Sequence, residues 1–462
     1  MFANDLDEKW LAFRRSVDEL NAFRRPQVLR KYQADLLDSD SFALTSPLTG
    51  KEVLVTRSTM LADRGAYLIP DQARSWLVSG PTRFGFPLWE LVTEADRKRW
   101  LLNSANAETS DISEREIQAL NAFPPEADNV LGRGTTLLIG DAHFAHHLWN
   151  ELAGLDEWLA HATDDAVANL AIVTRAEPLG PLEWTFPRLL PALSGQADPA
   201  RQRRRLLAGA RVVTKVGSCR VTSRLREQIK AVSDQRADPS ATNRARQLLQ
   251  NAWPRIWMSV RLESRTADNQ EEFLLETIRR VFLAYPDAAV VFDGFSFPVG
   301  FFSDPRTMNL REEFTARSAA ANAFIEHLRE QIRARLGNSA SSRLCSVSGL
   351  SLFDAINIGA YCEYYVCHAG TLQHKIAWIH NIPGLIHLPL NNEARAVWHA
   401  AQVEDGIVPD LMPAGLTIPT DPPASGRQRD RNFNYHFENV AKAADFVVSA
   451  MRARIGTSSP AR

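Results

Sequence analysis

The C-terminal half of the chain alternates short apolar runs with longer helical patterns, and this alternation limits the folds open to it. Strands joined by crossover helices form parallel sheets, because a parallel connection needs a dozen or more residues. The pattern therefore predicts a doubly wound sheet. The predicted strands are Ile256–Val260, Ala288–Phe292, Leu344–Val347, Tyr364–Cys367 and Gly384–Leu388, and the predicted helices are Asn269–Tyr285, Leu310–Leu336 and Ser351–Gly359.

A second, shorter alternation precedes this one. An apolar run at 135–139 is followed by a helical pattern at 144–161 and by two further apolar runs, at 170–174 and 210–214. Residues 1–40 have helical spacing, and 40–100 are rich in aromatic residues, Gly and Pro, which indicates a small β-rich element.

A chain of 462 residues is long enough for two such domains. We expect an α/β fold of two Rossmann-like domains facing a central cleft, with a small N-terminal α+β extension. The expected boundaries are 1–128, 129–250 and 251–462, with a loop at 421–432 and a final helix, Phe437–Ile455, packing back on the last domain.

Composition excludes several classes of function. The formal net charge is -1 and the one basic run, 201–205, is short, so no nucleic-acid partner is expected. Four scattered cysteines without a CxxC pair argue against zinc and disulfide scaffolds. The first ten residues lack the pattern of a signal peptide, and no apolar run could cross a bilayer. We expect a cytoplasmic protein, which would act at the inner face of the membrane if it associates peripherally.

The segment 367–378 is the first candidate site. A strand ends in a small-residue turn and runs directly into a helix, so that Gly370 lets a ligand approach the backbone and Thr371 can cap the helix and donate a hydroxyl. The first N–H groups of such a helix favour a pyrophosphate. An ordinary strand-to-helix turn is the alternative. Four further polar side chains converge on it: His368, Gln373, His374 and Lys375.

Two arginines follow the strand 256–260. Arg261 and Arg265 could neutralise a diphosphate leaving group, because a guanidinium matches phosphate oxygens in a bidentate manner. The alternative is that they form ion pairs with Glu263 or Glu271.

The segment 140–151 places three histidines and an aspartate at a strand-to-helix junction. His143 and His147 have the i, i+4 spacing of helical zinc sites, but no third ligand is evident. A general base is the more attractive role for His143 or Asp141, because deprotonating a hydroxyl needs a group of suitable pKa. The alternative is a set of buried, hydrogen-bonded histidines that fix the turn.

These motifs resemble a known family. The run "SGLSLFDAINIGAYCEYYVCHAGTLQHKIAWIHNIPGLIHL" resembles the donor-domain signature of GT-B glycosyltransferases, including heptosyltransferases. A closer resemblance is to bacterial capsular-polysaccharide transferases related to plant xylan xylosyltransferases, which carry an "HGA-x-L" turn and an "HF/HW…L…L" helix. Here "CHAGTL" and "HFAHHLWNELAGLDEWL" occupy those places in the same order. The resemblance covers about 130–400; the chain has Ala-Gly where the family has Gly-Ala, and its first 120 residues have no counterpart.

The resemblance implies transfer of a sugar from a nucleotide-sugar donor to a hydroxyl of a glycan or lipid-linked glycan, in bacterial surface-polysaccharide biosynthesis. It implies no metal and no cofactor, an acceptor near His143 and His146, and a diphosphate stabilised by the two arginines and Lys375. Two alternatives stay open: a metal-dependent hydrolase using Asp141, His143 and His147, and a non-catalytic nucleotide- or glycan-binding scaffold. The resemblance places the donor near His368, Gly370, Thr371 and Gln373.

Overall fold

The computed structural model of the protein describes residues 8–71, 74–102, 109–121, 134–193, 212–263, 265–389, 393–420 and 434–456. The chain divides into two compact units. Unit 1 comprises Met1–Glu177 and Pro181–Thr222, and unit 2 comprises Pro178–Gly180 and Ser223–Arg462. The predicted loop 421–432 and the basic run 201–205 lie outside the described residues.

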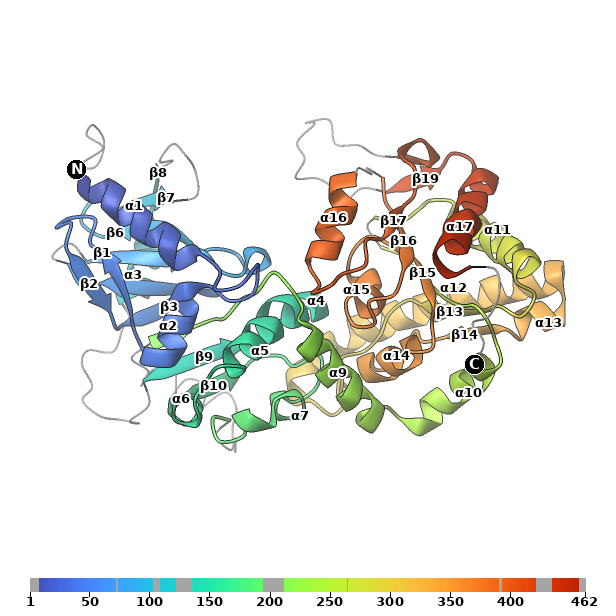
Figure 1. Ribbon diagram of the computed structural model, residues 1–462, viewed down its shortest axis with the longest axis horizontal. Coiled ribbons are helices and arrows are strands. Elements are labelled where there is room, and N and C mark those ends of the chain that lie inside the picture. Colours follow the sequence, from blue (N-terminus) through green and yellow to red (C-terminus); the bar gives the residue numbers. More distant parts are fainter. Residues whose placement is uncertain are drawn as a thin grey trace. The chain divides into compact units, whose positions relative to one another are not determined.

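Unit 2 is built on a six-stranded parallel sheet with the order β14-β13-β12-β15-β16-β17 (Figure 1). Numbered along the chain, this order is 3-2-1-4-5-6, which is that of dinucleotide-binding folds. All five predicted strands are confirmed, and the sixth, β17, is a two-residue addition at the edge. The strands are β12 (Arg255–Ser259), β13 (Ala289–Asp293), β14 (Leu344–Ser346), β15 (Tyr364–His368), β16 (Gly384–His387) and β17 (Asp410–Leu411).

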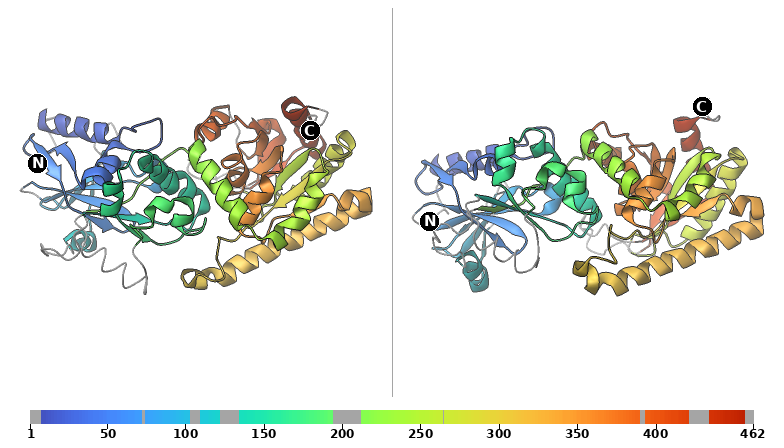
Figure 2. Two further views of the ribbon diagram at one scale, coloured as in Figure 1. Left: turned by 60° about the horizontal axis from the view of Figure 1, so that its bottom comes forward. Right: turned by 90° about the horizontal axis from the view of Figure 1, so that it is seen from below.

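Helices cover both faces of this sheet. Side chains alternate along β12, so that Ile256 and Met258 pack against α11, α12 and α17, whereas Trp257 packs on the other face with residues of α10 and α14. Figures 1 and 2 show α12 as the long helix of this unit. The helices are α9 (Ser223–Arg236), α10 (Pro239–Gln250), α11 (Gln270–Ala284), α12 (Arg311–Leu336), α13 (Asn338–Ser341), α14 (Leu352–Gly359), α15 (Thr371–Ala377), α16 (Glu393–Ala401) and α17 (Val440–Ile455).

Two short antiparallel strands complete unit 2. β18 (Thr417–Pro419) pairs with β19 (Tyr435–Phe437). Within β19 the side chain of Tyr435 is buried and reaches the ring of His387 at the end of β16. This pair was not predicted from the sequence, because three residues carry too little periodicity to be recognised.

Unit 1 contains a three-stranded parallel sheet with the order β10-β9-β11. The strands β9 (Thr135–Ile139), β10 (Ala171–Thr174) and β11 (Val212–Thr214) match the predicted runs. After β9 a continuous helical segment follows, made of α4 (Phe144–His146), the π-helical turn η2 (His147–Leu152) and α5 (Ala153–Leu159). The parallel α/β architecture predicted for both parts of the chain is therefore confirmed.

The predicted β-rich element is a six-stranded antiparallel sheet in the order β3 to β8. The helices α1 and α2 pack on one face of it, and α3 packs on the other. β11 adjoins β3 through Ser58, whose hydroxyl accepts a hydrogen bond from the Val213 N–H and donates one to its carbonyl, both at 2.6 Å. The elements are α1 (Glu8–Asn21), α2 (Lys31–Ser39), β1 (Phe42–Thr45), β2 (Glu52–Val55), β3 (Ser58–Leu61), β4 (Arg64–Ile69), β5 (Ser75–Ser79), β6 (Leu88–Thr93), β7 (Lys98–Leu101), β8 (Thr109–Asp111) and α3 (Glu114–Asn121).

The division of the chain differs from the expected boundaries in two respects. Residues 223–250, placed with the preceding domain on sequence grounds, belong to unit 2, because α10 packs against α14 and the face of the unit 2 sheet. The expected N-terminal extension shares a unit with β9, β10 and β11. Among the described residues, no helix combines the length and the apolar character needed to cross a membrane.

Candidate functional site

The strand order of unit 2 changes direction between β12 and β15. Ligands of open α/β sheets bind beyond the carboxyl ends of the strands at such a switch point. β12 ends at Ser259 and β15 ends at His368. The Ser259 hydroxyl accepts a hydrogen bond from the His368 N–H at 2.8 Å and lies 2.9 Å from Nδ1 of the His368 ring. The two strand ends are thus fixed to each other at the place where the sequence predicts a donor site.

Gly370 lies directly beyond β15 and has backbone angles open to glycine alone, with φ 116° and ψ -151°. A Cβ atom at this position would lie 3.0 Å from Nη1 of Arg265. The guanidinium of Arg265 therefore rests over the glycine. Among the described residues Arg265 forms no ion pair, and burial lowers its pKa. Within the described part of the chain, the structure thus places a cation without a counterion beside the predicted phosphate turn.

Arg261 adds a second guanidinium to this place. Burial, followed by the charge of Arg265, lowers the pKa of Arg261 to about 10. Gln270 holds its backbone, since the Arg261 N–H donates to the amide oxygen and the amide nitrogen donates to the Arg261 carbonyl, both at 2.9 Å. Glu263, one expected ion-pair partner, bonds to Arg317 at 2.9 Å. The negative charge of Glu263 partly offsets this lowering of the pKa of Arg261. Two guanidinium groups this close to each other favour an anion as ligand.

Beneath the arginines lies a cluster of buried rings. The rings of His368 and His387 have centroids 4.4 Å apart, and Nδ1 of His387 lies 2.5 Å from the hydroxyl of Tyr435. Burial is the main cause that lowers the pKa of both histidines, to about 3 for His387. Both rings are neutral, so they add no charge of their own. The sequence analysis missed His387 and Tyr435, although His387 ends a predicted strand at the same edge.

The remaining predicted donor residues are less accessible to a ligand. α15 begins at Thr371 with Gly370 as N-cap and no side-chain cap, so the predicted cap by Thr371 is wrong. Gln373 is buried. The ammonium group of Lys375 is also buried, 2.5 Å from Oδ1 of Asp293 and 3.0 Å from the hydroxyl of Ser296. Because Lys375 forms this buried ion pair, we no longer assign it to phosphate binding.

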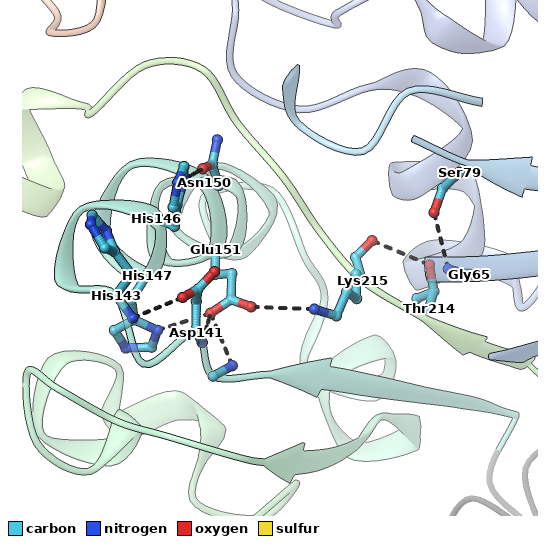
Figure 3. A network of polar contacts seen from close by, with 11 residues as sticks. Gly65, Ser79, Asp141, His143, His146, His147, Asn150, Glu151, Thr214 and Lys215 are labelled. Carbon is cyan, nitrogen blue, oxygen red and sulfur yellow. Dashed lines mark hydrogen bonds and ion pairs between the residues drawn. The ribbon is translucent and has the colours of Figure 1, made fainter. Parts of the chain in front are cut away.

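In unit 1, the turn after β9 is organised by a buried carboxylate (Figure 3). Oε2 of Glu151 accepts hydrogen bonds from the N–H groups of Gly140 and Asp141 and contacts Nδ1 of His147, all at 2.9 Å. Nζ of Lys215 lies 4.0 Å from Oε1. Burial alone would raise the pKa of Glu151, but the hydrogen bond and charge of His147, with Lys215, bring it below its ordinary value. His147 is therefore a buried, hydrogen-bonded histidine that fixes the turn.

His146 has a different environment. Its Nδ1 lies 2.9 Å from Oδ1 of Asn150, whose amide nitrogen donates to the carbonyl of Ser218. Because the amide orientation is set by Ser218, the Asn150 oxygen faces the imidazole and the proton is assigned to Nδ1. The lone pair of a neutral His146 is then on Nε2. His143 lies at the N-cap of α4, with its exposed ring centred 5.0 Å from that of His146.

Asp141 accepts the backbone N–H of His143 at 2.8 Å. The structure thus brings Asp141, His143 and His146 together on one turn and separates His147 from them. Within the described part of the chain, no group of three or more His, Cys, Asp or Glu side chains is arranged to hold a metal ion.

Together, these features define a two-unit α/β protein in which unit 2 has a dinucleotide-type sheet with a cationic switch point. No protein-family model matches the sequence. No curated protein matches it either.

Several solved structures are similar. The Escherichia coli ADP-heptose lipopolysaccharide heptosyltransferase II is 11% identical, over 69% of this chain and 98% of that chain, with a TM-score of 0.34. Staphylococcus aureus MnaA with UDP is 14% identical, over 70% and 69%, with a TM-score of 0.30. Anabaena Alr3699/HepE with UDP and glucose is 10% identical, over 70% and 91%, with a TM-score of 0.26. Function is therefore inferred from the residues of the site.

Proposed function

We propose that the protein is a glycosyltransferase of the GT-B type, which moves a sugar from a nucleotide-sugar donor to a hydroxyl of a glycan. The observation that supports this most directly is the pair of arginines at the switch point of unit 2. Arg265 lies over Gly370 without an ion pair among the described residues, and burial, with the charge of Arg265, lowers the pKa of Arg261. A nucleoside diphosphate matches two neighbouring guanidinium groups in charge and in bidentate geometry.

Sugar transfer develops negative charge on the leaving diphosphate, and this charge must be stabilised next to the two arginines. When the bond between the anomeric carbon and the diphosphate breaks, the electron pair stays on the diphosphate oxygen. Two guanidinium groups that already lie at this place stabilise that charge. We therefore propose that the leaving diphosphate is neutralised by Arg261 and Arg265, with no metal or other cofactor. Activity that persists in excess EDTA is the expected result.

We assign activation of the acceptor hydroxyl to the turn after β9. His146 is the preferred base because its Nδ1 is held by Asn150, which leaves the Nε2 lone pair to take the hydroxyl proton. Asp141 and His143 are retained as candidates on the same turn. A role in bacterial surface-polysaccharide synthesis at the cytoplasmic face, and the capsular subfamily suggested by the sequence, are further parts of the proposal.

The test of the donor site is nucleotide binding. Thermal-shift screening and calorimetry with nucleoside diphosphates and monophosphates identify the ligand, and Arg265→Ala is then compared with wild type. Losing one bidentate charged contact should weaken diphosphate binding by about 10- to 100-fold. Arg265→Lys keeps the charge but loses the bidentate geometry, so its diphosphate affinity should lie between those of wild type and Arg265→Ala. Arg333→Ala, an exposed arginine on α12, is the matched control.

Two results would contradict the proposal. The donor site is refuted if Arg265→Ala binds every diphosphate as well as wild type and Arg333→Ala do. Transfer is refuted if nucleotides bind but the donor is never consumed in the presence of glycan acceptors, which would favour a non-catalytic scaffold. His146→Gln should lower kcat while leaving diphosphate affinity unchanged.

A further inference from the structure

Unit 1 contains a hollow of about 260 Å³ beside the turn that follows β9. Its walls come from the hairpin turn between β3 and β4, from the turn between β5 and β6, and from His146. The residues with polar side chains that line it are Asp63, Arg64, Thr82, Arg83 and His146. This hollow thus joins the antiparallel sheet, which had no functional assignment, to the candidate base.

The turn between β5 and β6 is held by hydrogen bonds from buried side chains of other segments. The carbonyl of Gly85 accepts hydrogen bonds from Nε of Arg30 at 3.1 Å and from the amide of Gln33 at 3.2 Å. The hydroxyl of Tyr32 donates to the carbonyl of Phe86 at 2.5 Å. All three donors are buried. A turn fixed by buried side chains keeps its shape before a ligand arrives, which is typical of a preformed binding site.

The polar groups of the hollow balance one another in charge. Arg64 donates to Glu90 at 2.9 Å, so its charge is already compensated. Within the described residues Asp63 and Arg83 form no ion pair, and each is exposed. One carboxylate, one guanidinium and the Nε2 of His146 remain to bind a ligand. Such a set suits a neutral molecule with several hydroxyl groups, because a carboxylate and a guanidinium together have no net charge to attract an ion and both form hydrogen bonds with hydroxyl groups.

Aromatic surface adjoins these polar groups. The ring of Trp89 lies against Gly80, where a Cβ atom would come within 3.0 Å of it. Phe84 stacks on Trp89 with centroids 5.7 Å apart and remains 40% exposed, with the guanidinium of Arg83 4.7 Å from its ring centre. An apolar ring surface next to hydroxyl-binding groups matches the two kinds of surface on a sugar.

We propose that this hollow binds one neutral sugar ring of the acceptor glycan. Asp63 and Arg83 bond its hydroxyl groups, and His146 accepts a hydrogen bond from the hydroxyl that is to be glycosylated. The size agrees with a single ring, since sites for larger ligands occupy on the order of 300–1,000 Å³. The identification of the sugar as an acceptor rests on the function proposed above, whereas the binding of a sugar here does not.

The test uses the full-length protein without nucleotide. Histidine ring resonances are followed by long-range nitrogen–proton NMR, and His146 is identified by its loss in His146→Gln. Methyl glycosides of glucose, galactose, mannose and xylose are titrated, and sodium glucuronate is titrated separately. A neutral glycoside should shift the His146 signals. Arg83→Ala and Asp63→Asn should each weaken this response by about 10-fold or more, and Arg15→Ala, an exposed arginine on α1, should not.

The proposal is overturned if no neutral glycoside shifts His146, or if glucuronate alone does so. It is also overturned if Arg15→Ala weakens the response as much as Arg83→Ala does. Failure of the donor assignment appears in a different measurement, the diphosphate affinity of Arg265→Ala. In a transfer assay Arg83→Ala should raise the KM for the acceptor at least 10-fold and change the KM for the donor little.

Discussion

The buried ion pair between Lys375 and Asp293 provides the sharpest test of the energetics. The two side chains are 4% and 0% exposed, and Lys375→Met removes the ammonium group while keeping most of the volume. The carboxylate would then be buried without a cation among the described residues. Breaking one side of such a pair costs about 3–5 kcal/mol. The variant should remain folded only if the rest of unit 2 can sustain that loss.

A second route gives the same magnitude. The variant can avoid a buried charge by protonating Asp293, whose ordinary pKa is 3.8. Keeping it protonated at pH 7 costs about 4 kcal/mol, since one pKa unit corresponds to about 1.4 kcal/mol. Burial already raises the folded-state pKa of Asp293 in the wild type, so the loss relative to wild type is smaller than this cost. It is largest at high pH and vanishes where both folded proteins bind the proton, at a pH above 3.8. The destabilisation should therefore fall by about 1.4 kcal/mol for each pH unit below 7.

The measurement is urea unfolding at pH 7 and pH 6, with each variant compared with wild type at the same pH. Lys230→Met is the control, because Lys230 pairs with Glu227 at 2.9 Å on an exposed part of the same unit and should contribute about 0–1 kcal/mol. Lys375→Met/Asp293→Asn should recover much of the stability. Equal losses in the two lysine variants, or a loss independent of pH, would refute the reasoning. So would a stable Lys375→Met that no longer binds nucleotide.

Two further predictions concern glycine geometry and acid stability. Gly370→Ala should lower the free energy of unfolding by about 1–3 kcal/mol, and Gly140→Ala should lower it more. The new Cβ at 140 would lie 2.4 Å from the backbone nitrogen of Ala176, whereas the Cβ at 370 would meet only a movable guanidinium. Thermal unfolding of the two variants measures this order, and equal losses would contradict it. Burial lowers the pKa of three histidines to about 4, 3 and 3, so the unfolded chain binds protons that the folded chain excludes. Stability should be full above about pH 6.5 and decline below it, by up to about 1.4 kcal/mol per pH unit for each ring, and urea midpoints that stay constant from pH 7 to pH 5 would exclude this. The three histidines are His380, His387 and His399.

The sequence was most informative where a strand is buried on both faces. β12, β13, β15 and β16 are continuous apolar runs, which is what a parallel sheet covered by helices requires. β17 and β19 were not predicted, because two or three residues show no periodicity and their pairing depends on distant parts of the chain.

Site residues at the ends of predicted strands could also be predicted, whereas their distant partners could not. Gly370 and Arg265 were identified as candidates because their strand ends set their place in the sheet. The partner of Lys375 could not be inferred, although Asp293 at the end of an apolar strand is a charged residue that needs a nearby cation. The hollow of unit 1 was also missed. Asp63 and Arg83 reach His146 through contacts between residues more than 60 positions apart, for which local pattern carries no signal.

The π-helical turn at His147–Leu152 has a consequence for how this segment tolerates change in length. A π turn holds one residue more than the α-helical turn that it replaces, and each residue of an α-helix advances the chain by about 100°. Deleting one residue from this turn would therefore restore an ordinary α-helical turn and keep Phe144–His146 in phase with Ala153–Leu159. The same deletion in the regular turn Ala153–Leu159 would rotate the segment before it by about 100° and turn His146 away from the hollow. In this helix the place of a deletion decides whether His146 keeps its orientation.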